Sequence, residues 1–156
     1  MDRVFRPESP EEARNEVRQL VPMKPDVTKI WVDDFWGQYP KMKSEISAAI
    51  IQEAHRHGLR VAAHLFHLED ARKLVALGVD IIAHSVRDGE IDGALLAEMK
   101  KRQVVYIATL SLDEFAYLYG DAPDWLNDPS SRPRWNRGCS RRSRVLPTKR
   151  GCARIE

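Results

Sequence analysis

The chain has 156 residues, 43% of them hydrophobic, and a formal net charge of +2, which fits one globular domain with a sizeable core. It has no apolar run of about 18 residues and no signal peptide at its N-terminus, which argues against a membrane span or a membrane partner. We therefore expect a cytoplasmic location by default. Both cysteines lie near the C-terminus, so the body of the chain is not a disulfide-built fold.

Charge is distributed unevenly along the chain. Residues 130–156 contain nine basic side chains and one acidic side chain, whereas residues 1–129 contain 16 basic and 22 acidic ones. A basic arm that binds nucleic acid is one interpretation of this tail, but no nucleic-acid-binding module accompanies it. We expect no nucleic-acid partner. We interpret residues 130–156 as an irregular tail, disordered or derived from a frameshift, and residues 1–129 as the folded domain.

Helical and strand patterns alternate along the body of the chain. The sequence Ser9-Pro10-Glu11-Glu12 combines a capping serine, a proline at the first helical position and acids in the first turn. Alternation of this kind predicts parallel strands whose carboxyl ends share one edge of the sheet, where α/β proteins hold their active sites. The expected strands are 27–33, 60–65, 79–84 and 104–110, and the expected helices are 10–21, 44–57, 71–77, 91–99 and a short one opened by Ser111.

Each of the first three strands carries one side chain that could bind a metal: Lys29, His64 and His84. One histidine near a strand end usually has a structural role. Two histidines at matching positions on consecutive strands favour a metal site and a structural role equally. A lysine in an apolar strand is costly to bury as a cation, so it must lose its charge, pair or be modified. The alternative is that Lys29 faces solvent on an edge strand. The fourth strand, apolar throughout, is expected to be covered on both faces.

Taken as a series, Lys29-Ile30, Glu53 to His64, and Ala71 to His84 resemble the amidohydrolase superfamily, especially its imidazolonepropionase- and prolidase-like branch. The resemblance implies a (β/α)8 TIM-type barrel, of which this chain would contain about strands four to seven. It also implies that Lys29 is carboxylated to a carbamate that bridges two divalent metals, usually zinc, and that His64 and His84 are metal ligands. The implied reaction is hydrolysis of an amide, cyclic amide, peptide-like or ester bond through a metal-activated water.

The chain departs from the family in what it lacks. A complete barrel takes about 250 residues. The family also has a His-x-His pair on its first strand and a catalytic Asp on its last, and neither has a counterpart here. The nearest pattern, His55-Arg56-His57, falls at a helix end. We therefore expect a fragment with no catalytic residue of its own, poor metal binding, little turnover, and exposed sheet edges that invite self-association.

Three further side chains close to the strand ends are candidates for binding a small-molecule substrate: Asp33, His67 and Arg87. Arg87 could receive a substrate carboxylate. Loop solvation and helix capping are the ordinary alternatives for Asp33. For the whole chain, two other interpretations stay open. One is a non-catalytic open-sheet α/β domain that binds a ligand or partner, although no Gly-rich phosphate loop follows any expected strand. The other is a half-barrel that self-associates.

Overall fold

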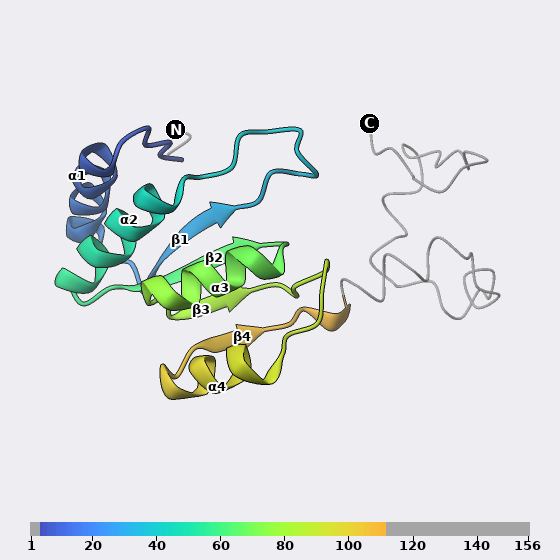
Figure 1. Cartoon of the computed structure of the whole chain (residues 1–156). Helices are drawn as coiled ribbons and strands as arrows, with labels where there is room; N and C mark the ends of the chain where they lie inside the picture. Colours follow the sequence, from blue (N-terminus) through green and yellow to red (C-terminus); the bar gives the residue numbers. More distant parts are fainter. Residues whose placement is uncertain (1–3, 112–156) are drawn as a thin grey trace, which may run out of the picture. The chain divides into compact units, whose positions relative to one another are not determined.

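Four strands and four α-helices alternate in the computed structural model, which describes residues 4–111 (Figure 1). Residues up to Thr109 form one compact unit. The tail expected over 130–156 and most of the helix opened by Ser111 lie outside the described residues. The elements are α1 (Pro10–Leu20), the 3₁₀ helix η1 (Val21–Met23), β1 (Val27–Val32), α2 (Ser44–Arg56), β2 (Arg60–Leu65), α3 (Leu68–Leu77), β3 (Ile81–Ala83), α4 (Gly93–Lys101) and β4 (Val105–Ile107).

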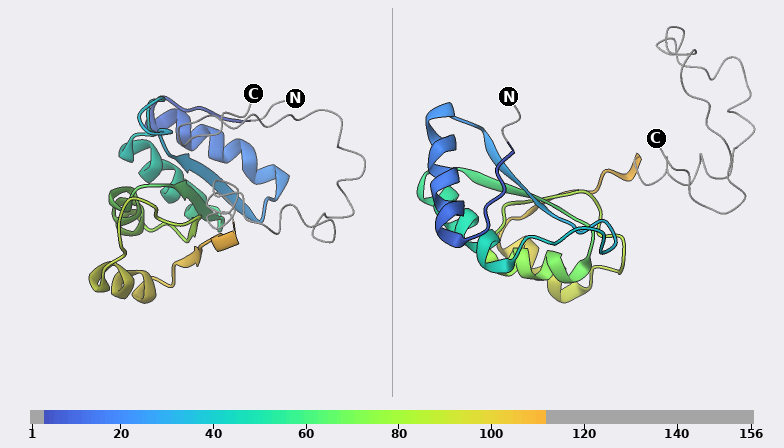
Figure 2. Two further views of the ribbon diagram at one scale, coloured as in Figure 1. Left: turned by 90° about the vertical axis from the view of Figure 1, so that its right-hand side faces the viewer. Right: turned by 90° about the horizontal axis from the view of Figure 1, so that it is seen from above.

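The four strands form one parallel sheet in the order β1-β2-β3-β4, so every strand pairs with its neighbour in sequence. The helices lie together on one face of this sheet (Figure 2). A doubly wound sheet reverses its strand order and has helices on both faces. Sequential order with helices on one side is instead the arrangement of a barrel wall, in which the uncovered face would line the interior. The predicted fold class, a partial TIM-type barrel, is confirmed.

The hydrophobic core lies between the sheet and the helix layer. Side chains alternate along β1, where Ile30 and Val32 are buried and Lys29 and Trp31 are exposed. The helix-facing side chains of the central strands have no more than 2% of their surface exposed, among them Val61, Leu65 and Ile82. Because the open face has no comparable layer in residues 4–111, this single interface supplies most of the buried apolar surface of the described part.

The helix ends follow the signals read from the sequence. The Ser9 hydroxyl accepts a hydrogen bond from the Glu12 N–H at 3.2 Å, and Pro10 occupies the first helical position. Helix α3 ends at Gly78, whose φ of 93° lies in the left-handed region that only glycine adopts at little cost. Asp92 caps α4 by accepting a hydrogen bond from the Leu95 N–H at 2.9 Å. This cap explains why α4 begins after Ile91 rather than at it.

The expectation for the fourth strand is wrong. β4 contains three residues rather than seven, and Val105 and Ile107 expose 48% and 47% of their surface. Among the described strands it lies at an edge of the sheet, and its open face is uncovered. The sequence could not show this, because a short apolar run looks the same in a strand covered on one face and in one covered on both. β1 is the other edge among the described strands. Within residues 4–111 the sheet thus ends at β1 and β4, and the exposure of both edges stays a prediction for the whole chain. Within residues 4–111 no helix is long and apolar enough to cross a membrane.

Glu53 ties α2 to α1 at a position that is 3% exposed. Its carboxylate accepts hydrogen bonds from Arg18 Nε at 2.7 Å and Arg56 Nη1 at 3.0 Å, and His57 Nε2 lies 3.3 Å away. The Arg18 hydrogen bond is the largest of the influences that hold the pKa of Glu53 below its usual 4.5. The two helices are thus joined by a charged contact whose strength depends on pH.

We expect stability to fall in acid partly through Glu53. A carboxyl group whose pKa is lower in the folded state stabilises that state above the unfolded pKa, and the contribution is lost as the pH falls through the folded pKa. The free energy of unfolding from urea titrations should therefore decrease as the pH drops from about 5 to about 3, and less steeply for Glu53→Gln. Glu90→Gln, at an exposed position, should keep the wild-type slope. Equal slopes for Glu53→Gln and wild type would contradict the prediction.

Candidate metal site on the open face of the sheet

Strand register brings the three predicted metal-binding residues to one face. Trp31 pairs with His64, which pairs with Ala83, and Lys29 pairs with Ala62. Paired residues of neighbouring strands point to the same side of a sheet. Lys29 and His64 therefore both lie on the open face, and His84 follows directly after β3 at the carboxyl edge.

The rings of His64 and His84 lie in contact, with centroids 4.7 Å apart. Burial lowers the pKa of His64, and the nearby His84 and Lys29 lower it further, while the hydrogen bond with Asp33 acts in the opposite direction. The imidazole of His64 is thus held neutral, which is the form that binds metals. The structure brings the rings of His64 and His84 into contact and places Lys29 on the same face of the sheet as His64.

Lys29 is exposed rather than buried. The premise that its cation is costly because it is enclosed is wrong for this chain, since β1 is an edge strand among residues 4–111 and its open face meets solvent. The alternative predicted for it, a lysine facing solvent on an edge strand, describes its position. Its side chain nevertheless shares the open face with His64.

His64 is 8% exposed and is held on three sides. Its ring stacks on Trp31 at a centroid distance of 3.5 Å and an interplanar angle of 12°. Its Nε2 lies 3.2 Å from Oδ2 of Asp33. Its Nδ1 is buried and has no hydrogen-bond partner within the described part of the chain. A buried imidazole nitrogen without a partner, beside a second histidine, fits a divalent metal ligand.

His84 has a φ of 79°, which is unusual for a residue other than glycine. Its backbone N–H donates to the Ile107 carbonyl at 2.9 Å, and its Nδ1 lies 3.4 Å from Oγ1 of Thr109. The turn after β3 is therefore held to the end of β4 by both backbone and side chain. Non-glycine residues in this conformation occur most often at functional sites.

A cluster formed by Asp33, Asp34 and His67 lies beside the histidines. Asp33 and His67 are two of the predicted substrate-binding residues. Ligand-type atoms of Asp33, Asp34 and His67 lie within 4.8 Å of one another. His67 contacts Asp88 through Nδ1 at 2.9 Å and Asp34 through Nε2 at 3.5 Å, and the Asp88 contact raises the pKa of His67. His67 thus connects the loops that follow β1 and β3. Asp88 has no role in the predicted site, because a single aspartate in a turn carries no signal of its own.

The other predicted substrate-binding residues have local partners. Asp33 Oδ1 accepts a hydrogen bond from the Phe35 N–H at 3.1 Å, and Oδ2 faces His64. The guanidinium carbon of Arg87 lies 5.9 Å from the centre of the Phe66 ring, and the Arg87 N–H donates to the Phe66 carbonyl at 3.0 Å. These contacts fix the loops around the histidines.

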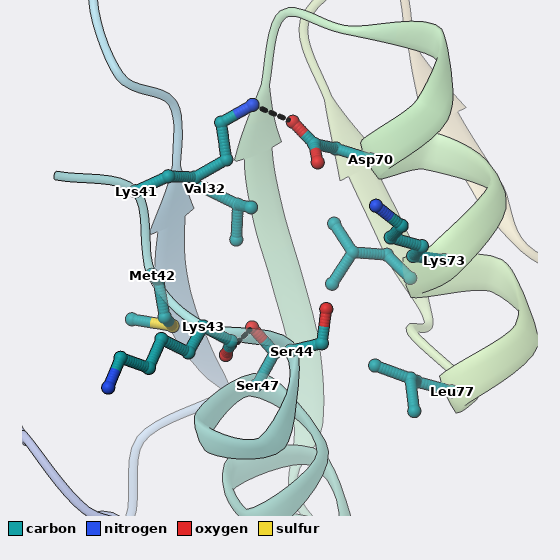
Figure 3. A pocket seen from close by; sticks show the side chains of 10 residues that line it. Val32, Lys41, Met42, Lys43, Ser44, Ser47, Asp70, Lys73 and Leu77 are labelled. Atoms are coloured by element: carbon teal, nitrogen blue, oxygen red, sulfur yellow. Dashed lines mark hydrogen bonds and ion pairs between the residues drawn. The ribbon is translucent and has the colours of Figure 1, made fainter. Parts of the chain in front are cut away.

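A separate hollow of about 230 Å³ lies between the segment before α2 and helix α3 (Figure 3). The ion pair between Lys41 Nζ and Asp70 Oδ2, at 2.7 Å, crosses its upper end. Val32 lines it from the helix-facing side of β1, opposite the side on which Lys29 lies. It contains none of the predicted site residues and does not belong to the candidate metal site.

No family model matches this sequence, and no curated protein matches it. Solved structures do. A Xaa-Pro dipeptidase crystallised with methionine in its active site is 26% identical, with a TM-score of 0.62 over 74% of this chain and 29% of that chain. A protein from Bifidobacterium longum named as a prolidase is 30% identical, with a TM-score of 0.52 over 62% of this chain and 24% of that chain. An amidohydrolase is 23% identical, with a TM-score of 0.59 over 80% and 30%.

These matches span less than a third of each known chain. The amidohydrolase shows the fold alone, whereas the dipeptidase and the Bifidobacterium longum protein also share about a quarter or more of the aligned residues. The strand order, the helix layer on one face of the sheet and the similarity to these solved structures all indicate the same barrel-type fold. The predicted resemblance is thereby confirmed, since the described residues are similar to part of the fold of amidohydrolase-family structures such as the dipeptidase.

Proposed function

We propose that this chain provides one side of the metal site of a hydrolase that cleaves amide, cyclic amide, peptide-like or ester bonds. Lys29, as a carbamate, together with His64 and His84 would hold two divalent ions, most suitably zinc. Bound metal would lower the pKa of a water molecule and polarise the scissile carbonyl. The dipeptidase and prolidase named among the similar structures support a peptide-like substrate.

The observation that carries the proposal is the convergence of three side chains from three consecutive strands. The His64 and His84 rings are 4.7 Å apart, Lys29 is close enough to act on the pKa of His64, and His64 Nδ1 is buried without a hydrogen-bond partner in residues 4–111. Donors from strands on the far side of a barrel would have to complete the site. We propose that the 156-residue chain alone binds metal weakly and has no measurable hydrolase activity.

Zinc binding tests the ligand assignment. We expect equilibrium dialysis followed by metal analysis to find weak zinc binding by the purified chain, because the two histidines are in contact and Lys29 lies on the same open face as His64. Lys29→Met, His64→Gln and His84→Gln should each reduce the bound zinc at least tenfold, since each removes a ligand. His55→Gln is the matched control. His55 lies at the end of α2 and contacts Asp80, so this substitution should leave zinc binding unchanged.

Two outcomes would contradict this reading. Equal zinc binding by wild type and all three ligand variants would exclude the assigned ligands. Zinc-dependent hydrolysis of an Xaa-Pro dipeptide by the wild-type chain would show that the three donors suffice, and the proposed inactivity would be wrong. Far-ultraviolet circular dichroism of each variant controls for loss of the fold.

A second candidate role, self-association into a larger barrel, is favoured by the groove along the outer edge of β1. A cavity of about 480 Å³ lies between β1, α1 and the N-terminal segment, and its lining is mostly apolar, including Phe5, Val17, Leu20 and Ile30. The Thr28 hydroxyl in this region is buried and has no partner among residues 4–111. We propose that a β-strand from a second copy of the chain occupies this edge. A non-catalytic open-sheet domain is disfavoured by the one-sided helix layer.

A further inference from the structure

We infer that Asp33 is a positioning residue that fixes the proton of His64 on Nε2, so that Nδ1 is the nitrogen available to a metal. This inference rests on the proposed function for its use, but the placement of the proton can be tested without metal. It assigns to Asp33 a role different from the substrate contact expected for it, because the carboxylate is engaged by the histidine itself.

The geometry of the carboxylate makes the assignment. Oδ2 of Asp33 lies 3.2 Å from Nε2 of His64, and both side chains have about a tenth of their surface exposed. An ionised carboxylate can only accept hydrogen bonds, so the facing nitrogen must carry the proton. Nδ1 is buried and faces no acceptor within the described part of the chain, so a proton there would have no hydrogen-bond partner. The remaining nitrogen, Nδ1, is therefore left with its lone pair.

The carboxylate is itself held in place. Oδ1 of Asp33 accepts the Phe35 N–H at 3.1 Å, so the two oxygens have different and fixed partners. Trp31 stacks on the His64 ring at 3.5 Å and restricts its plane. Ring orientation and proton position are thus both set by residues of β1 and its following loop, although His64 lies on β2. Carboxylates that hold ligand histidines in this way raise metal affinity.

The unused nitrogen indicates what the arrangement is for. A structural histidine in a core has both nitrogens paired, because an unmet hydrogen bond in a buried position is unfavourable. Here Asp33 satisfies Nε2, while Nδ1 is buried with no partner in the described part of the chain. The neighbouring His84 ring, 4.7 Å away, adds a second nitrogen-bearing group on the same side.

Asp33→Asn should reverse the proton position on His64. The Phe35 N–H still requires an acceptor, so the amide oxygen of the new side chain will take the place of Oδ1. Its NH₂ group will then face His64 Nε2 and can only donate to it. The proton must move to Nδ1. Asp33→Ala, which offers neither donor nor acceptor, should leave a mixture of the two tautomers.

The measurement is a long-range ¹H–¹⁵N spectrum of the metal-free, ¹⁵N-labelled 156-residue chain, with the His64 signals identified by their loss in His64→Gln. Wild type should show a protonated Nε2 and an unprotonated Nδ1, and Asp33→Asn the reverse. Asp34→Asn is the matched control, because no contact of Asp34 with His64 is found among the described residues, and it should keep the wild-type pattern. The same tautomer in wild type and Asp33→Asn would overturn the inference.

Zinc binding then separates this inference from the proposed function. If both hold, Asp33→Asn should weaken zinc binding about 10–100-fold relative to wild type, while the control His55→Gln keeps the wild-type affinity. A reversed tautomer with no zinc binding even by wild type would support the role of Asp33 and contradict the proposed function. Zinc binding by wild type that is unaffected by a reversed tautomer would show that Nδ1 is not a ligand.

Discussion

Ile82→Ala should lower the free energy of unfolding by about 2–5 kcal/mol, the range for removing most of a fully buried isoleucine side chain. Ile82 lies at the centre of β3, is 0% exposed and faces the helix layer. The missing atoms would leave a cavity between β3 and the helices, because a sheet held by neighbours on both sides cannot collapse into it. Since small domains have only about 5–15 kcal/mol of stability, the loss would be a large fraction of the total.

The matched control is Ile107→Ala on the adjacent strand β4. Ile107 is 47% exposed and lies on the open face, so at protein concentrations where the chain is monomeric its truncation should cost no more than about 1 kcal/mol. Urea unfolding followed by circular dichroism at several protein concentrations would measure both. Similar losses for the two isoleucines would show that the open face is covered as well as the helix-facing one, and the one-sided core would then be wrong.

The parts of the fold that could be predicted are those encoded locally. Ser9, Pro10 and Gly78 mark helix ends by their own backbone and side-chain preferences, and the alternation of helix and strand patterns fixes a parallel sheet. His64 and His84 could be expected to converge, because strand ends share an edge. These signals depend on residues within a few positions of one another or on topology alone.

What could not be predicted depends on neighbours in space. β4 has the composition of a covered strand, and only the absence of a strand beyond it in residues 4–111 makes it an edge. Lys29 was expected to be enclosed for the same reason. The contact between Asp33 and His64 joins residues 31 positions apart through side-chain torsions that no sequence period reports. The convergence of His64 and His84 was thus predictable, but the contact of His64 with Asp33 was not.

We expect the 156-residue chain to self-associate and to be a dimer in solution. Each end of the described sheet has one unpaired edge, and four parallel strands from each of two copies would give the eight that close a barrel. Pairing β4 of one copy beside β1 of another would cover Val105 and Ile107 and fill the apolar groove along β1. Sedimentation equilibrium should report the mass of two chains.

Ile107→Lys should raise the dimer dissociation constant at least tenfold, because a charged side chain on an edge strand opposes pairing with another sheet. Leu96→Lys is the control: Leu96 is 44% exposed and lies on helix α4 rather than on a strand, so the same charge there should leave the mass unchanged. A monomeric wild-type chain would contradict the proposed dimer directly. A dimer that persists in Ile107→Lys would place the contact elsewhere, and the groove along β1 would then need another occupant. If the dimer does form through these edges, the open faces of two copies face one another, and each set of Lys29, His64 and His84 gains a second set opposite it.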